Sequence, residues 1–362
     1  MEFFEKIKIL YFRYERHISS AALVFGFTVD SFTLQRIDLF FENLIFLIHL
    51  FVVGIGIIFL NLYEGGVVGE RYIKSIRPWL PLPIQFSLGA LFSGFLIFYS
   101  RSASFVVSWP ILFFLLLLLI GNEFFRSRYS RLVFQVSMYF VAIFSYTIFF
   151  VPVVMHSIGA DTFLISGVVS LVLIGAFIYI LSILAPKRMQ GSRKFLYKSI
   201  GGIFLIINIL YFLNIIPPIP LALKEGGVYH SVTRVGSTGY AVTYEQQHWY
   251  EYFRLHQIIH VTPGARLYFY SAVFAPTDLN TNIVHRWEYF DEGTNEWSDS
   301  LSVLFPIIGG RDGGYRGYSV KTNITPGRWR VRVETTRGQL LGRQTFIVEY
   351  AQGAVLTKTV IQ

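Results

Sequence analysis

Hydrophobic and polar positions divide the chain into two parts with different patterns. Up to Leu223, long apolar runs alternate with short charged loops, whereas from Lys224 onward short β-prone runs are separated by Gly, Pro, Asn and Asp. A helix needs about 20 mostly apolar residues to cross a bilayer. Six segments of the first part qualify directly, near 38–62, 82–100, 105–125, 132–158, 162–184 and 200–222, and a seventh near 18–34 has a shorter apolar core. The pattern predicts a transmembrane helical domain over 1–223, in which 18–34 is the weakest span and a re-entrant path stays open for it.

The second part, 224–362, is predicted to form an all-β domain. Short strand-like runs recur at even spacing over about 125 residues, which is typical of an Ig-like β-sandwich. In Trp329–Thr335 apolar and charged residues alternate, as in an antiparallel strand with one buried face. Trp287 and Trp329 lie within such alternating runs and are predicted core residues. Trp297, in the polar hairpin DEGTNEWSDS, is instead the predicted exposed aromatic and a candidate partner contact.

Composition agrees with an α-helical integral membrane protein. The chain is 53% hydrophobic and only 15% charged, whereas soluble domains contain about 25% charged residues. Cysteine is absent, which excludes disulfides and thiolate metal sites. The net charge of +9 does not indicate a nucleic-acid partner, because the basic residues lie mostly in short loops beside apolar runs, where they act as topology signals.

The distribution of Lys and Arg predicts the orientation in the cell membrane. If all seven segments span, one set of loops holds 15 basic residues and the opposite set holds only Arg36 and Arg101. Cytoplasmic loops carry the excess of positive charge. The N-terminus is therefore predicted to be cytoplasmic and the C-terminal domain extracytoplasmic, in the periplasm or outside the cell. The 15 residues are Lys6, Lys8, Arg13, Arg16, Arg71, Lys74, Arg77, Arg126, Arg128, Arg131, Lys187, Arg188, Arg193, Lys194 and Lys198.

One apolar segment carries ionisable residues on a single helix face. Asp38, Glu42 and His49 fall within about 40° of each other at 100° per residue, so this polar stripe is predicted to face other helices or a watery cavity. Two interpretations stay open, a path for protons, cations or substrate that leads to His49, and a structural polar network. Asp30 and Arg36 are predicted to form an ion-pair cluster at the exterior mouth of the first hairpin.

A glycine-rich loop of the β domain, GGRDGGYRGYS, is the candidate ligand-binding segment. Its glycines permit unusual backbone conformations, and arginine with tyrosine suits anionic or sugar-like ligands. The alternative is a wide loop whose arginines pair with acidic neighbours such as Asp291 or Glu292. The candidate binding residues are Arg311, Tyr315, Arg316 and Tyr318.

Several motifs resemble an uncharacterised bacterial family of polytopic membrane proteins with a C-terminal β-sandwich domain of unknown function. They read H-R-W at 285–287, GGR-x2-GYR-x-YS-x-K at 309–321 and G-x-WRV at 327–331, and the run from Arg16 to Asp38 resembles the start of such proteins. The resemblance implies an architecture but no activity, so it supplies no catalytic residues.

The leading hypothesis for function is therefore non-enzymatic. The β-sandwich would recognise an envelope partner (a protein subunit, a glycan or a lipid headgroup), while the helices contact membrane lipids and assemble with other membrane subunits. The alternatives are a transporter or ion pathway through the polar stripe, and an intramembrane enzyme that acts on a lipid-linked substrate. No catalytic motif and no metal-ligand spacing is evident, so we expect no catalytic residues, metal or cofactor.

Overall fold

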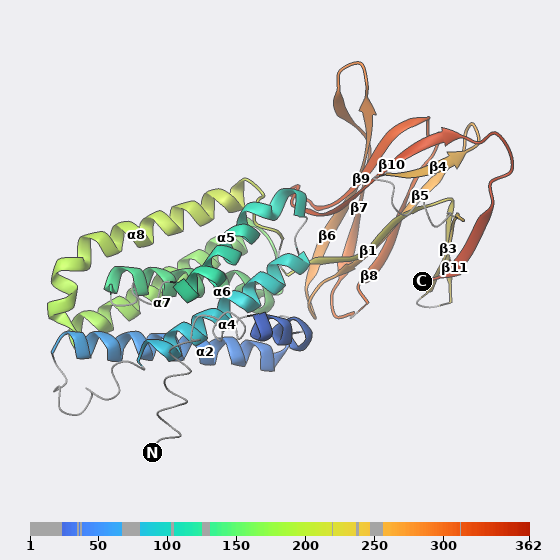
Figure 1. The fold of residues 1–362 in the computed structure, drawn as a ribbon. Helices are drawn as coiled ribbons and strands as arrows, with labels where there is room; N and C mark the ends of the chain where they lie inside the picture. Colours follow the sequence, from blue (N-terminus) through green and yellow to red (C-terminus); the bar gives the residue numbers. More distant parts are fainter. Residues whose placement is uncertain are drawn as a thin grey trace, which may run out of the picture. The chain divides into compact units, whose positions relative to one another are not determined.

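The computed structural model describes residues 24–34, 36, 38–66, 80–102, 105–124, 131–218, 220–236, 239–246, 256–311 and 313–362. The chain divides into two compact units, which Figure 1 shows as a helical bundle and a β unit. The β unit comprises Ile216–Gln362 together with the short pieces Arg101–Ser108 and His156–Ile158.

The helical unit follows the predicted order of apolar segments. Among the described residues, five helices are long and apolar enough to cross a membrane, and α5 contains a shorter apolar stretch, Val107–Asn122. Residues 24–33 are also helical, but the rest of the predicted span 18–34 lies outside the described residues. The helices are α2 (Phe40–Glu64), α4 (Pro81–Ser102), α5 (Phe105–Phe124), α6 (Leu132–Met155), α7 (Ala160–Leu184) and α8 (Pro186–Phe212).

The last helix differs from the segment predicted for it at 200–222. α8 begins at Pro186, because proline at the first helical position is already set to the helical φ. It ends at Phe212, where Asn214 adopts a left-handed φ of 58° that terminates the helix. The basic run that follows Pro186 is thus the first half of a helix rather than a loop.

Aromatic side chains from four helices meet at α6, the most buried of the candidate spans. Phe149 stacks on Phe95 of α4 at 5.7 Å between ring centroids and meets Tyr99 edge-on at 4.9 Å. Phe144 stacks on Phe204 of α8 at 5.6 Å, and α2 and α7 also pack against α6. This aromatic core holds the helices together.

The β unit contains two sheets packed face to face and a smaller third sheet. Strand orders are β1-β5-β8, β4-β10-β9-β6-β7 and β11-β3-β2. The strands are β1 (Ala222–Tyr229), β2 (Ser231–Val235), β3 (Gly239–Glu245), β4 (Gln257–Val261), β5 (Leu267–Phe274), β6 (Asn280–Asp291), β7 (Glu296–Ile308), β8 (Tyr315–Lys321), β9 (Gly327–Thr335), β10 (Leu340–Tyr350) and β11 (Thr357–Ile361).

The connections between the two larger sheets are those of an Ig-like sandwich. β5 and β8 lie in one sheet, while β6, β7, β9 and β10 lie in the other, as strands B and E oppose strands C, C′, F and G in Ig domains. β4 pairs in parallel with β10, and β9 pairs antiparallel with both β6 and β10. The predicted Ig-like β domain is thereby confirmed.

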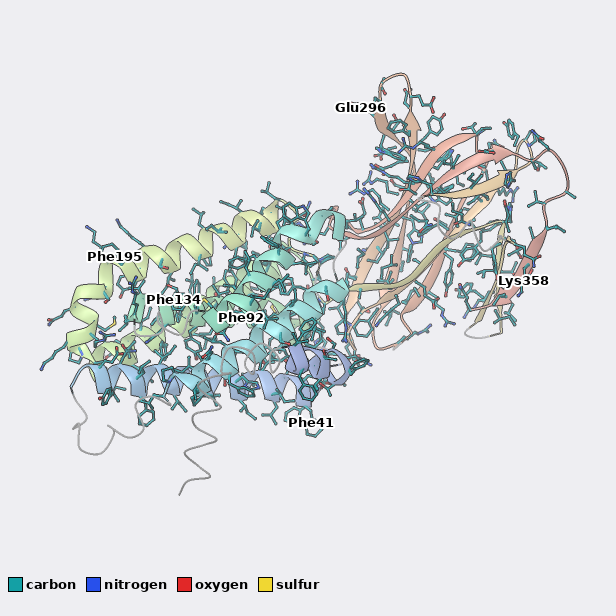
Figure 2. All side chains as sticks on the ribbon, in the orientation of Figure 1. Phe41, Phe92, Phe134, Phe195, Glu296 and Lys358 are labelled. Carbon is teal, nitrogen blue, oxygen red and sulfur yellow. The ribbon has the colours of Figure 1, made fainter. Side chains whose placement is uncertain are left out.

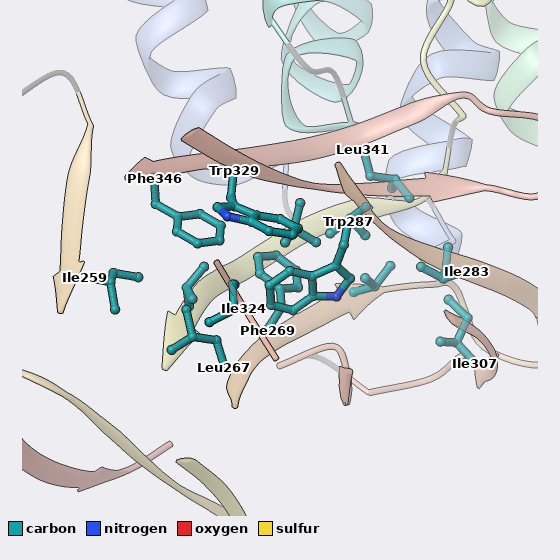
Figure 3. Packing of buried hydrophobic residues seen from close by; sticks show 14 of the residues in the cluster. Ile259, Leu267, Phe269, Ile283, Trp287, Ile307, Ile324, Trp329, Leu341 and Phe346 are labelled. Atoms are coloured by element: carbon teal, nitrogen blue, oxygen red, sulfur yellow. The ribbon is translucent and has the colours of Figure 1, made fainter. Parts of the chain in front are cut away.

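The core between the two sheets contains both predicted tryptophans (Figure 3). Trp287 and Trp329 are buried among residues such as Phe269 and Phe346. Trp329 Nε1 donates a hydrogen bond to the Thr325 carbonyl at 2.8 Å. The indole groups therefore satisfy their polar atoms within the fold, as buried tryptophans usually do.

A polar network links three of the motif residues inside this core. His285 is fully buried, with Nε2 2.8 Å from Ser271 Oγ and Nδ1 3.0 Å from Ser319 Oγ. Trp287 Nε1 donates to the same Ser319 Oγ at 2.9 Å. Burial lowers the pKa of His285 to about 3, so the imidazole is neutral at physiological pH. The H-R-W and Y-S motifs thus meet in a structural hydrogen-bond network.

Candidate functional site

Alternation along β6, β7 and β9 places charged and aromatic side chains on the outer face of the five-stranded sheet. In β9, Trp329, Val331 and Val333 are buried on the core side, so the intervening arginines point outward. We call this surface the arginine face. It consists of Arg286, Glu288, Phe290, Trp297, Asp299, Arg328, Arg330, Arg332 and Glu334.

Two buried carboxylates organise the arginine face. Glu288 is 4% exposed and pairs with Arg330 through both carboxylate oxygens. Glu334 is 1% exposed and lies 2.7 Å from Arg286 Nε and 2.9 Å from Arg332 Nη2. The hydrogen bond to Glu334 raises the pKa of Arg286 above its ordinary value. Buried carboxylates held by arginines fix the side chains that surround them, so this surface is rigid.

The end of the arginine face nearest the β6–β7 hairpin is a stack of rings and guanidinium groups. Trp297 lies 5.1 Å from Phe290 between ring centroids, and Arg330 and Arg328 lie over its ring at 4.2 and 5.7 Å. Arg328 also lies 4.5 Å over the ring of Phe290. Among the described residues, Arg328 has aromatic partners but no carboxylate partner. The prediction of a simply exposed Trp297 is corrected, because this stack leaves the side chain half-buried.

The arginines of the glycine-rich loop contact a ring and a backbone carbonyl. Arg311 lies 5.4 Å over the ring of Tyr315, and Arg316 Nη1 donates to the Gln362 carbonyl at 3.2 Å. Tyr318 is 41% exposed and joins a tyrosine cluster with Tyr240 and Tyr268. The glycines have a structural role as well.

Gly309 illustrates that structural role. A Cβ added there would lie 1.6 Å from the Pro276 carbonyl oxygen, so only glycine fits at this position.

The structure does not bring all predicted binding residues together. Trp297 lies near the start of β7 and Arg311 follows its end. The strand contains 13 residues, about 40 Å at 3.3 Å per residue. Arg311 and Tyr315 therefore belong to a different part of the β unit from the arginine face.

The polar stripe of α2 makes contacts with its neighbours. Arg36 and Asp38 form an ion pair of 2.6 Å. Asp30 instead accepts a hydrogen bond from Ser93 of α4 at 2.6 Å. Asp30 and Arg36 therefore have different partners and do not pair with each other. His49 is half-buried, and its Nδ1 lies 3.2 Å from Ser87 Oγ. These contacts link α2 and the preceding helix to α4.

Glu42 occupies a different environment. It is buried in the first turn of α2, where the helix dipole favours a negative charge.

A second polar cluster in the helical unit was missed by the sequence analysis. Asn61 and Gln135 are fully buried and joined by a hydrogen bond of 2.6 Å. Arg188 at the start of α8 contacts Asn61 and pairs with Glu64. The available signal was an amide residue near one end of each of two apolar runs, but nothing in the local sequence indicates that residues so far apart form a pair.

A carboxylate between two histidines was also missed. Glu245 Oε1 lies 2.9 Å from His230 Nε2, and Glu245 Oε2 lies 2.9 Å from His260 Nδ1. Burial alone would raise the pKa of Glu245, but the hydrogen bonds from both histidines outweigh it and hold the pKa below its usual range. A pocket of about 430 Å³ lies beside this group, with His256 and Tyr350 also in its lining. The described residues contain no group of three His, Asp or Glu side chains placed to hold a metal ion.

A protein-family model matches part of the β unit. The family model described as "Protein of unknown function (DUF2914)" matches residues 280–348, which contain the whole arginine face. The resemblance to an uncharacterised family with a β-sandwich is thereby confirmed for the C-terminal part. No curated protein matches this chain.

Similar solved structures include an immunoglobulin-like protein from Pseudomonas aeruginosa, with a TM-score of 0.21 and 12% identity, covering 36% of this chain and 96% of that chain. The alkylpurine DNA glycosylase AlkC of Pseudomonas fluorescens has a TM-score of 0.21 and 11% identity, covering 83% of this chain and 97% of that chain. Similarity at this level carries no argument about function. The fold defines a chain of apolar, membrane-type helices with an Ig-like domain of unknown function.

Proposed function

We propose that the protein is a multi-pass membrane protein that spans seven times, with a cytoplasmic N-terminus and an extracytoplasmic sandwich that recognises an envelope partner. Five described helices are long and apolar enough to span. The strong asymmetry of Lys and Arg between the two ends of the predicted spans, which includes the basic first half of α8, supports the orientation. The helices anchor the sandwich and assemble with other membrane subunits. The protein acts as an accessory or assembly component.

The arginine face is the proposed recognition surface. The observation that carries this assignment is the stack at its hairpin end, where Arg328 rests on Phe290 and Trp297 without a carboxylate partner among the described residues. Tryptophan and arginine are the residues that most often dominate binding energy. The Glu288 and Glu334 ion pairs hold the neighbouring side chains, so binding an anionic or aromatic group costs little ordering entropy.

Replacing Arg328 or Trp297 with alanine is expected to release the partner. Truncation of a central interface residue costs about 2 kcal/mol or more, a loss of roughly thirtyfold in affinity. The measurement is gentle purification of the full-length protein from its native membrane, with mass spectrometry of the proteins, glycans and lipids that remain bound. Arg266→Ala is the matched control, because Arg266 is an exposed arginine that directly precedes β5, in the opposed sheet.

Retention of the same stoichiometric partner by the wild type and all three variants would exclude the arginine face as the recognition surface. Loss of a partner from the Arg266→Ala control as well would indicate a general charge effect rather than a site.

An ion or proton pathway through the helices is the second candidate function. The favouring observation is Glu42, a residue that is 9% exposed and has no side-chain hydrogen-bond or ion-pair partner among the described residues, on the same helix face as His49. Wild-type protein in liposomes is expected to dissipate a pH gradient, reported by a pH-sensitive dye inside, and Glu42→Gln is expected to abolish the flux. Asp161→Asn, at an exposed acid of α7, is the control. Wild-type liposomes as tight as empty ones would contradict this candidate.

A further inference from the structure

The first half of α8 is basic and carries no acidic residue. Its sequence PKRMQGSRKFLYKS contains five Lys and Arg residues. One of them, Arg188, turns toward α2, where it pairs with Glu64. The other four, Lys187, Arg193, Lys194 and Lys198, are exposed. This half of the helix therefore presents four positive charges that have no ion-pair partner within the part of the chain that the structure describes.

Three of these residues form a line along the helix, which we call the lysine stripe. Lys187, Lys194 and Lys198 fall within about 40° of each other at 100° per residue. By the same rotation, the buried residues Met189, Leu196 and Ile200 lie on the opposite side of α8. The lysine stripe therefore faces away from the helices against which α8 packs.

Two exposed aromatic residues border the lysine stripe. Phe195 is 66% exposed and Tyr197 is 52% exposed, at about 80° on either side of the stripe. Figure 2 shows Phe195 projecting from the outer side of α8. Arg193 lies 5.8 Å over the Tyr197 ring. Aromatic rings beside basic residues are characteristic of the headgroup level of a membrane.

The apolar part of α8 is too short to cross a bilayer alone. From Ile200 to its end at Phe212 the helix covers about 20 Å at 1.5 Å per residue, against about 30 Å of hydrocarbon. A spanning α8, which is part of the proposed function, must include residues back to about 193. Lys194 then lies at the hydrocarbon boundary and Lys198 about 6 Å deeper at 1.5 Å per residue, a depth from which lysine extends its ammonium group to the phosphates.

We propose that the lysine stripe, with Phe195 and Tyr197 beside it, binds the phosphate of an anionic phospholipid headgroup in the leaflet that the first half of α8 enters. The three ammonium groups neutralise the headgroup, and the two rings pack against its glycerol and upper acyl chain. Charge complementarity argues for a lipid occupant, because the stripe lies on the face of α8 that is turned away from the other helices and has no carboxylate on its own helix half.

The test uses the full-length protein in nanodiscs of phosphatidylcholine mixed with phosphatidylglycerol, with native mass spectrometry of the lipids retained after release. We expect the wild type to retain phosphatidylglycerol preferentially. The triple variant Lys187→Gln, Lys194→Gln, Lys198→Gln should lose this preference by about tenfold or more, since each basic residue near the headgroups contributes independently. The triple variant with arginine at the same positions should keep the preference for phosphatidylglycerol. This result would show that replacing the three lysines does not by itself disrupt the fold.

The charge-matched control is the triple variant Arg266→Gln, Arg343→Gln, Lys358→Gln, which removes exposed positive charges of the β unit and should retain phosphatidylglycerol as the wild type does. An unchanged preference for phosphatidylglycerol in the glutamine triple variant of the lysine stripe would overturn the proposal. The proposal would also be overturned if that variant lost a co-purified acidic protein and not a lipid. Extraction of the wild type from membranes by alkaline carbonate would overturn the proposed membrane function itself. This result can be distinguished from the two lipid-binding results.

Discussion

Replacing Ser319 with alanine is expected to destabilise the protein by about 2–6 kcal/mol, because two buried polar groups lose one partner at about 1–3 kcal/mol each. Ser319 Oγ accepts from Trp287 Nε1 at 2.9 Å and lies 3.0 Å from His285 Nδ1. Both side chains are fully buried, so water cannot replace the hydroxyl. The measurement is denaturant unfolding of the full-length protein in detergent, with tryptophan fluorescence as the signal.

Ser302→Ala is the control for this prediction, because Ser302 is an exposed serine of β7 whose loss should change stability by less than about 0.5 kcal/mol. Equal unfolding free energies for the Ser319 and Ser302 variants would show that the network does not contribute to stability.

Acidification is expected to destabilise the β unit through His285. Burial lowers the pKa of this residue from 6.5 to about 3, so the unfolded chain takes up a proton that the folded chain does not. The stabilising contribution is complete above pH 6.5 and is lost progressively as the pH falls from 6.5 toward 3. At pH 5 the loss is about 2 kcal/mol. Unfolding free energies measured at intervals between pH 7 and pH 4 test this slope.

A variant without the titrating ring separates His285 from other acid effects. His285→Gln lowers stability at every pH, but its stability should fall less steeply between pH 6.5 and pH 5 than that of the wild type. Glu245 does not mimic this effect, because its pKa lies below the usual carboxylate range and its contribution is lost only at lower pH. Parallel slopes for wild type and variant would contradict the assignment to His285.

Local patterns were sufficient to predict most of the helices and the strand β9, but not β11 (Thr357–Ile361). The alternation in Trp329–Thr335 predicted the inward side chains of β9, and the structure confirms Trp329 as a core residue. Long apolar runs likewise predicted the helices, since hydrophobic length is a property of one segment. α8 was the exception, because its basic first half resembles a loop in the sequence. Only the structure shows the ion pair between Arg188 of this half and Glu64 of α2.

Interactions between distant segments could not be predicted in the same way. Ser319 meets Trp287 and His285 only because β8 and β6 lie in opposed sheets. Trp297 becomes half-buried because the register pairs it with Phe290 and because β9 supplies Arg328 and Arg330. Strand register and sheet packing decide such contacts, and neither is encoded in the spacing of residues within one strand.

The parallel pairing of β4 with β10 has a consequence for the size of the smallest folding unit. β4 precedes the matched segment 280–348, and its strand partner β10 ends at Tyr350, just beyond it. β5, which supplies Leu267, Phe269 and Val273 to the core, also precedes that segment. A fragment cut at residues 280 and 348 would keep most of the five-stranded sheet without β4, but only β8 of the opposed sheet. Most of its apolar side would be open to water, and its unpaired strand edges would be templates for aggregation. The region of family similarity is therefore smaller than the cooperative unit on which it depends.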